Sequence, residues 1–143
     1  MTINWLTENG VEWPHCVRHS DAQQWLARVA ADHQKMVGTL TYILTNDPGI
    51  LRVNREYLQH DYFTDVITFD YSKRGIVSGD VYISLDTVLS NAEAFGQSPE
   101  REMHRVVAHG LLHLCGINDK GPGEREIMEA HEDAALKCLP YEI

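Results

Sequence analysis

Apolar side chains recur along this chain with two periods, and the change of period predicts where helices and strands lie. Trp25, Leu26 and Val29 repeat at helical spacing after the capping residue Ser20, and we expect that helix to end near Gly38. Runs rich in β-branched and aromatic residues predict strands. These expected strands cover 2–6, Thr39–Thr45, Asp65–Tyr71 and Val77–Leu85.

The clearest helix signal starts at Ser98, which can cap the helix ahead of Pro99. We expect this helix to run to Leu114 or Cys115 and to stop at Gly116. Further helices are predicted over Ile50–Leu58, Asp86–Phe95 and Glu124–Leu139. With no repeat or linker, residues 1–143 are expected to form a single α+β domain, a small mixed sheet of about four strands packed with helices around a central metal-binding helix.

Composition narrows the functional classes. The chain has 143 residues and a formal net charge of −9, which argues against a protein that coats nucleic acid non-specifically. Three cysteines without paired spacing argue against a disulfide framework. No targeting signal and no bilayer-length apolar run is visible, so we expect a cytoplasmic protein with no membrane partner.

His109 and His113 are the first candidates for chemistry. Residues four apart on a helix are separated by about 400° of rotation, so both imidazoles lie on one face and can bind one tetrahedral ion. The spacing alone is weak support, because a chain with eight histidines contains such pairs by chance. Two hydrogen-bonded histidines on a core helix are the alternative interpretation.

Asp119 is the candidate third ligand. Gly116 lets the chain turn back over the histidines, and Asp119 follows His113 by six residues, within reach of the same ion. Three protein ligands leave a fourth position for water, as in a catalytic zinc site. Cys115 competes, although it points about 200° away from His113 on the helix, and His131 is a more remote alternative.

Several segments resemble a known family. The run H-G-L-L-H-L-C-G-I-N-D, from His109 to Asp119, resembles the signature H-G-x-L-H-L-x-G-Y-D-H of the YbeY family of bacterial endoribonucleases. The segments N-R-E-Y, T-D-V-I-T-F and G-D-V-Y-I-S, which begin at Asn54, Thr64 and Gly79, resemble the family's N-R-x-Y, T-D/N-V-L-S-F and G-D-I-x-I-S. All of these segments occur in the family's order.

The resemblance implies a single-strand-specific, zinc-dependent endoribonuclease with one Zn²⁺ per chain, acting in 16S rRNA 3′-end maturation and ribosome quality control. It implies single-stranded RNA, including 16S rRNA, as substrate, and a ribosome or ribosome-associated protein as partner. Arg55 matches the family's arginine, so we expect it to stabilise charge on the phosphate during catalysis. Its alternative role is a surface salt bridge to Glu56 or Asp61.

The sequence departs from the family at one ligand, because Asp119 stands where the family has its third histidine. A carboxylate is an ordinary zinc ligand, but it lowers the charge of the occupied site from +2 to +1. A bound water should therefore be less acidic, and the preference for metals should shift toward harder ions.

Two other functions fit parts of the pattern. A zinc peptidase shares the paired histidines, but Gly110 stands where the H-E-x-x-H motif has its glutamate, and no general base is evident. The second alternative is a non-catalytic, ribosome-associated module, in which the metal only stabilises the fold.

His104 has two possible roles: it is either a packed core histidine or a hydrogen-bond partner near the ligands.

Overall fold

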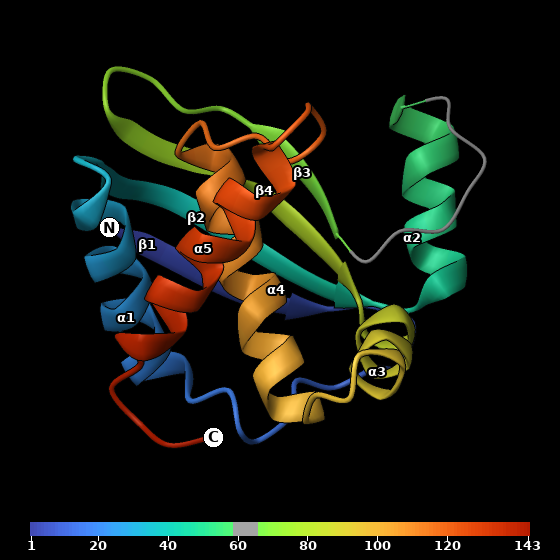
Figure 1. Ribbon diagram of the computed structural model, residues 1–143. Coiled ribbons are helices and arrows are strands. Elements are labelled where there is room, and N and C mark those ends of the chain that lie inside the picture. The colour runs from blue at the N-terminus through green and yellow to red at the C-terminus, as the bar shows by residue number, and fades with distance from the viewer. Residues whose placement is uncertain (59–65) are drawn as a thin grey trace.

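The computed structural model describes residues 1–58 and 66–143, and these contain a four-stranded sheet (Figure 1). The strands are β1 (Thr2–Thr7), β2 (Met36–Thr45), β3 (Val66–Asp70) and β4 (Ile76–Ser84). Their order is β1-β2-β4-β3, with β3 antiparallel to β4 and the other pairs parallel. The expected mixed sheet of an α+β protein is confirmed.

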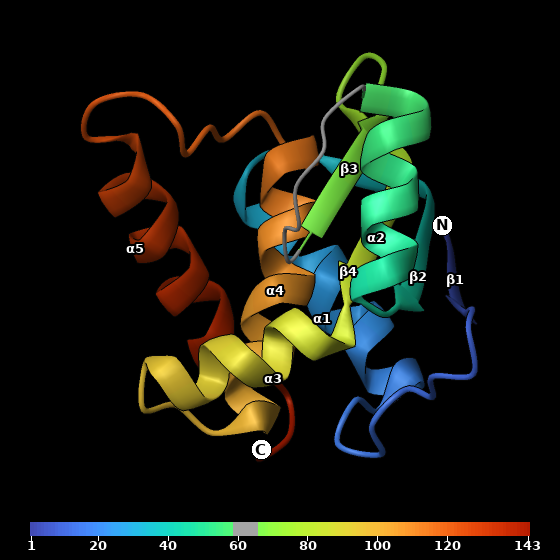
Figure 2. The ribbon, with the colours of Figure 1, turned by 90° about the vertical axis from the view of Figure 1, so that its right-hand side faces the viewer.

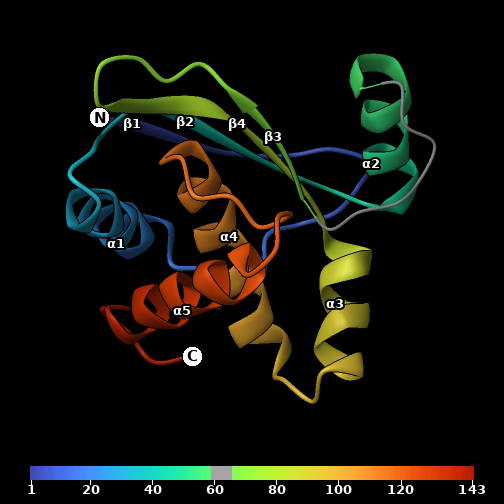
Figure 3. The same ribbon diagram turned by 45° about the horizontal axis from the view of Figure 1, so that its top comes forward.

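Helices cover both faces of this sheet. One face packs against α1 (His19–Asp32) and α4 (Pro99–Leu114), and α5 (Glu124–Lys137) packs on α4, away from the sheet (Figure 3). On the other face lies α2 (Asp47–Val53), which continues into the π-helical turn η1 (Asn54–Leu58) (Figure 2). The helix α3 (Leu85–Ala94) follows β4 and leads into α4.

Alternation along β4 explains why helices bind on both sides. Val81 and Ile83 point into the main core beneath α4, whereas Tyr82 between them packs with Ile50 and Val53 of α2. A strand that is apolar on both faces needs a cover on each. The sheet is therefore an inner layer beneath α4.

Both ends of α4 form as the sequence predicts. The Ser98 side chain accepts a hydrogen bond from the Arg101 amide at 3.1 Å, and Pro99 occupies the first turn. At the other end Gly116 has a φ of +98°, and the Ile117 amide donates to the Leu112 carbonyl at 3.1 Å. This glycine turn sends the chain back toward the helix, as expected.

The end of α1 differs from the prediction. The helix stops at Asp32 instead of near Gly38, because Gln34 takes the left-handed conformation, with a φ of +59°. The Lys35 amide then donates to the Ala30 carbonyl at 2.9 Å, which closes the helix without glycine. Gly38 instead lies in β2, where an added Cβ would come within 2.5 Å of Ser78 Oγ.

Smaller differences concern element edges. The predicted strand from Asp65 begins at Val66, and Asp65 itself lies outside the described residues. Ile127 was expected to pack from the last helix, but it is 54% exposed. Met128, Ala135 and Leu136, which the sequence also predicts to pack from this helix, are buried as expected.

Gly110 generates a prediction about how closely α4 approaches the sheet. An added Cβ would lie 2.6 Å from Val81 Cγ1, and Val81 is fully buried. Overpacking costs about 1–3 kcal/mol, whereas alanine gains about 1 kcal/mol in helix propensity. We expect Gly110→Ala to lower the free energy of unfolding in urea by up to about 2 kcal/mol.

The matched control is the same substitution in a Val81→Ala background. There the contact is relieved, so Gly110→Ala should be neutral or stabilising. An equal loss of stability in both backgrounds would refute close packing at this position.

Candidate metal centre

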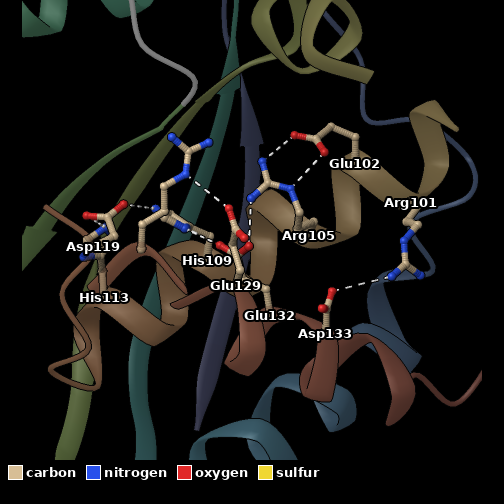
Figure 4. A network of polar contacts seen from close by, with 10 residues as sticks. Arg101, Glu102, Arg105, His109, His113, Asp119, Glu129, Glu132 and Asp133 are labelled. Carbon is tan, nitrogen blue, oxygen red and sulfur yellow. Dashed lines mark hydrogen bonds and ion pairs between the residues drawn. The ribbon is translucent and has the colours of Figure 1, made fainter. Parts of the chain in front are cut away.

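His109 and His113 lie one turn apart on α4, and the loop after Gly116 brings Asp119 back to them (Figure 4). His109 Nε2 is 3.5 Å from Asp119 Oδ2, and His113 Nε2 is 3.4 Å from Asp119 Oδ1. One potential ligand atom from each residue lies within 4.8 Å of the other two. This metal group, His109, His113 and Asp119, could therefore hold an ion.

The distances in the metal group fit a shared ion. Two atoms bound at about 2.0–2.1 Å to a tetrahedral ion are separated by roughly 3.3–3.4 Å, close to the observed spacings. Among the described residues, Asp119 Oδ1 is buried and has no hydrogen-bond partner. A buried acceptor without a donor is costly unless a cation satisfies it. The residues present therefore fit a divalent metal.

His113 is suited to bind as a neutral ring. Burial, followed by the neighbouring His109, lowers the pKa of His113 below its usual value. The two rings are nearly perpendicular, with centroids 4.5 Å apart and an interplanar angle of 82°. Because a metal binds only the unprotonated nitrogen, this environment favours coordination.

A buried carboxylate from α5 contacts the other side of His109. Glu132 Oε2 lies 2.5 Å from His109 Nδ1, and the Glu132 side chain is only 2% exposed. An ionised carboxylate can only accept, so this contact favours, in the neutral ring, the tautomer with its proton on Nδ1 and its lone pair on Nε2. That lone pair is the one that faces Asp119.

Arg105 links this carboxylate to a second one. Its Nη1 donates to Glu132 Oε1 at 2.9 Å, and its Nε donates to Glu102 Oε1 at 2.8 Å. Hydrogen bonding to Glu102 raises the pKa of Arg105 above its usual value. The buried charges are thus paired and hydrogen-bonded, which offsets the cost of removing them from water.

A groove of about 460 Å³ lies beside this centre. Its lining includes Phe95, Arg101, Arg105, His109, Asp119 and Glu129. The lining carries both signs of charge, and the exposed pairs Arg101–Asp133 and Arg125–Glu129 lie along it. His109 and Asp119 therefore face a space that a substrate could enter.

Arg55, predicted from the resemblance, lies elsewhere. It is exposed on η1, which contacts the edge strand β3 through Tyr57 and Phe69, whose rings are 5.8 Å apart. Arg55 is not among the described residues that line the groove. The structure therefore brings together the three predicted ligands but does not place Arg55 in the groove beside them.

The competing candidates are in other places. Cys115 packs against the core, outside the metal group, and the His131 ring contacts that of His33, the residue after α1, with centroids 4.8 Å apart. His104 is fully buried, with Nδ1 2.7 Å from the Glu100 carbonyl and Nε2 2.8 Å from the Tyr141 hydroxyl. It is the packed core histidine of the two interpretations.

Sequence reasoning missed Glu132 and Arg105. A usable signal existed, because Glu132 follows Met128 by four residues and precedes Leu136 by four, which places a carboxylate on the apolar face of α5. A charged residue among core positions needs a partner. The pattern does not show which residue of another helix supplies it.

Comparison with known proteins indicates the same family as the sequence motifs do. The family model described as "Endoribonuclease YbeY" matches residues 11–140. The chain is 58% identical to the Endoribonuclease YbeY of Phocaeicola vulgatus, over 96% of this chain and 98% of the relative. It is also 58% identical to that of Parabacteroides distasonis, over 99% of both chains, and 45% identical to that of Porphyromonas gingivalis, over 96% and 89%.

A solved structure shares the fold. The solution structure of TM1509 from Thermotoga maritima matches with a TM-score of 0.64 and 24% identity, over 95% of this chain and 90% of that one.

None of the helices in residues 1–58 and 66–143 combines the length and the apolar character needed to cross a bilayer.

Cys115 generates a test of the ligand set. Burial raises the pKa of its thiol to about 11, so at pH 8 only about one part in a thousand is thiolate. We expect iodoacetamide to label Cys115 far more slowly in the folded protein than in the urea-denatured chain, as measured by peptide mass spectrometry. Zinc should protect Cys115 no more than it protects Cys138, which also packs against the core, whereas selective protection of Cys115 would indicate that it is a ligand.

Proposed function

The chain belongs to the YbeY family of endoribonucleases, and on that premise we propose that it cleaves single-stranded RNA in a metal-dependent reaction. Its proposed role is 3′-end maturation of 16S rRNA and ribosome quality control in the cytoplasm. The observation that carries the proposal is the metal group, whose three ligand atoms lie within 4.8 Å of one another beside a groove. A divalent ion at such a centre can activate water and polarise a phosphoryl oxygen, which is the chemistry that hydrolysis of a phosphodiester uses.

His109, His113 and Asp119 are the proposed ligands of one Zn²⁺ per chain. A divalent ion held there supplies a Lewis acid for the phosphoryl oxygens and acidifies a water molecule. The two neutral rings leave the charge of the ion intact, and the Asp119 carboxylate reduces it by one. This donor set also suits harder ions than a set of three imidazoles does.

Arg55 is the proposed contact for the RNA phosphate. An exposed guanidinium can form two parallel hydrogen bonds to phosphate oxygens as their charge increases. Support comes from the position of η1 against β3, because β3 also packs against α4, which carries both histidines. The turn that carries Arg55 therefore lies at the β3 edge of the sheet, and α4 also packs against β3.

Gly110 disfavours the peptidase alternative. A glutamate after the first histidine serves as general base in H-E-x-x-H enzymes. Here even a Cβ at position 110 would lie 2.6 Å from Val81, so a longer side chain has no room without a shift of the helix. RNA hydrolysis remains the better supported reaction.

The acidic character of the chain supports a partner. A net charge of −9 repels RNA at long range, so binding by charge alone is disfavoured. We propose that the ribosome or a ribosome-associated protein brings this chain to its RNA, which leaves the active centre to select single-stranded segments.

Zinc binding gives the first test of this proposal. Wild-type protein should bind one zinc per chain, and zinc at about 100 times its Kd should stabilise it by about 2.7 kcal/mol. Asp119→Ala should gain less than about 1 kcal/mol at the same zinc concentration, because one of three ligands is lost. Thermal unfolding and metal analysis measure both quantities.

The control for this test is Asp133→Ala, which removes a carboxylate from the same groove but outside the metal group. It should respond to zinc as the wild type does. Equal stabilisation of Asp119→Ala and the wild type would rule out Asp119 as a ligand.

Cleavage of single-stranded RNA gives the second test. Arg55→Ala should retain its zinc and lose activity by about 100-fold, the usual cost of removing one charge-stabilising donor. Arg52→Ala is the matched control, because Arg52 lies one turn earlier and is bound by Glu8 and Glu56. It should stay within about twofold of the wild type. Full activity of Arg55→Ala would remove Arg55 from the mechanism.

A further inference from the structure

We propose that Glu132 is the positioning residue of the metal centre, fixing the ring orientation and the proton of His109 so that Nε2 is available for a metal. This inference rests on the proposed metal-dependent function. It assigns a role to a residue on α5, a helix that supplies no member of the metal group among the described residues.

The first step is geometric. The backbone of α4 fixes where His109 starts, but the ring can still rotate about its side-chain bonds. The contact of 2.5 Å between Glu132 Oε2 and His109 Nδ1 restricts that rotation from the opposite side. Nε2 then points toward Asp119 Oδ2, 3.5 Å away. One hydrogen bond thus sets both the direction of the ring and the nitrogen that carries the proton.

The second step concerns Glu132 itself, which is held in turn. Its other oxygen, Oε1, accepts from Arg105 Nη1 at 2.9 Å, and Arg105 is bound to Glu102. Both oxygens of Glu132 are therefore engaged, and its side chain is 2% exposed. A carboxylate whose two oxygens are both hydrogen-bonded is held in one orientation, whereas a solvated glutamate on the helix surface can adopt several.

The third step is electrostatic. Glu102 and Glu132 supply two negative charges and Arg105 supplies one positive charge, all at the interface of α4 and α5. The remaining negative charge lies against His109, and it favours a cation on the far side of that ring. The net negative charge of this network therefore favours a metal ion at the site. Holding α4 and α5 together does not require that charge.

A purely structural role for Glu132 predicts something different. In that case the carboxylate would serve Arg105 and the packing of α5, and the state of His109 would be incidental. Glu132→Gln separates the two roles, because it keeps the size of the side chain and a carbonyl for Arg105. Arg105 also keeps its contacts with Glu102. The fold should therefore survive while the charge facing His109 is lost.

The test is a zinc competition titration against a chromophoric chelator at one pH. We expect Glu132→Gln to bind zinc 10–100-fold more weakly than the wild type, the usual effect of losing such a partner. Glu129→Gln is the matched control, because it lies three residues earlier on α5, lines the same groove and is 57% exposed. It should bind zinc as the wild type does.

A second measurement detects the ring directly. Long-range ¹H–¹⁵N NMR of the metal-free wild type, recorded at a pH high enough for the ring to be neutral, should show the His109 proton on Nδ1. In Glu132→Ala the signal should move toward the mixture typical of free imidazole, and a merely structural role would not cause this change. Either wild-type zinc affinity in Glu132→Gln or an unchanged tautomer in Glu132→Ala overturns the inference.

These outcomes separate the two proposals. If the wild-type protein binds no zinc, the metal-dependent function fails, whatever Glu132 does to the tautomer. If the wild type binds zinc and the Glu132 variants bind it equally well, only the positioning role fails. Loss of affinity in Glu132→Gln alone, with Glu129→Gln unchanged, supports both.

Discussion

The close approach of α4 to β4 at Gly110 is the constraint on which the rest of the structure depends. Without a side chain at this position the helix packs directly on Val81, and the half-buried His109 and His113 lie next to it and three residues after it. The apolar face of α4 is anchored in the core, so the histidines cannot shift without repacking it. A rigid helix thus supplies two candidate ligands at fixed spacing.

Polar contacts complete what packing begins. Core side chains fix α4, but apolar contacts have no direction and cannot set the orientation of an imidazole ring. A hydrogen-bonded network orients the ring through charged groups between α4 and α5: Glu102, Arg105, Glu132 and His109. Such buried charges add little net stability. Their presence beside a candidate metal group is better explained by function than by folding.

Membership of the YbeY family and the geometry of the metal group support each other. Asp119, at the position where the resemblance leads us to expect a histidine, supplies a carboxylate that could bind the same ion with a different charge. The loop geometry after Gly116 tolerates this change, because Asp119 still reaches both histidines. The net charge of −9 does not favour binding of RNA by charge alone.

Local features of the sequence determined the ends of α4, the pairing of His109 with His113 and the turn at Gly116. Helical spacing and capping depend on neighbouring residues, so they could be predicted without the fold. The sequence also indicated Asp119 as a candidate ligand, because the short loop after Gly116 limits how far its side chain can lie from the two histidines. Only the tertiary structure decided that Glu132, 23 residues from His109, meets that ring. It also decided that Gln34 ends α1 and that Arg55 lies outside the groove. Contacts between elements depend on how helices dock, and that follows from the packing of the whole core.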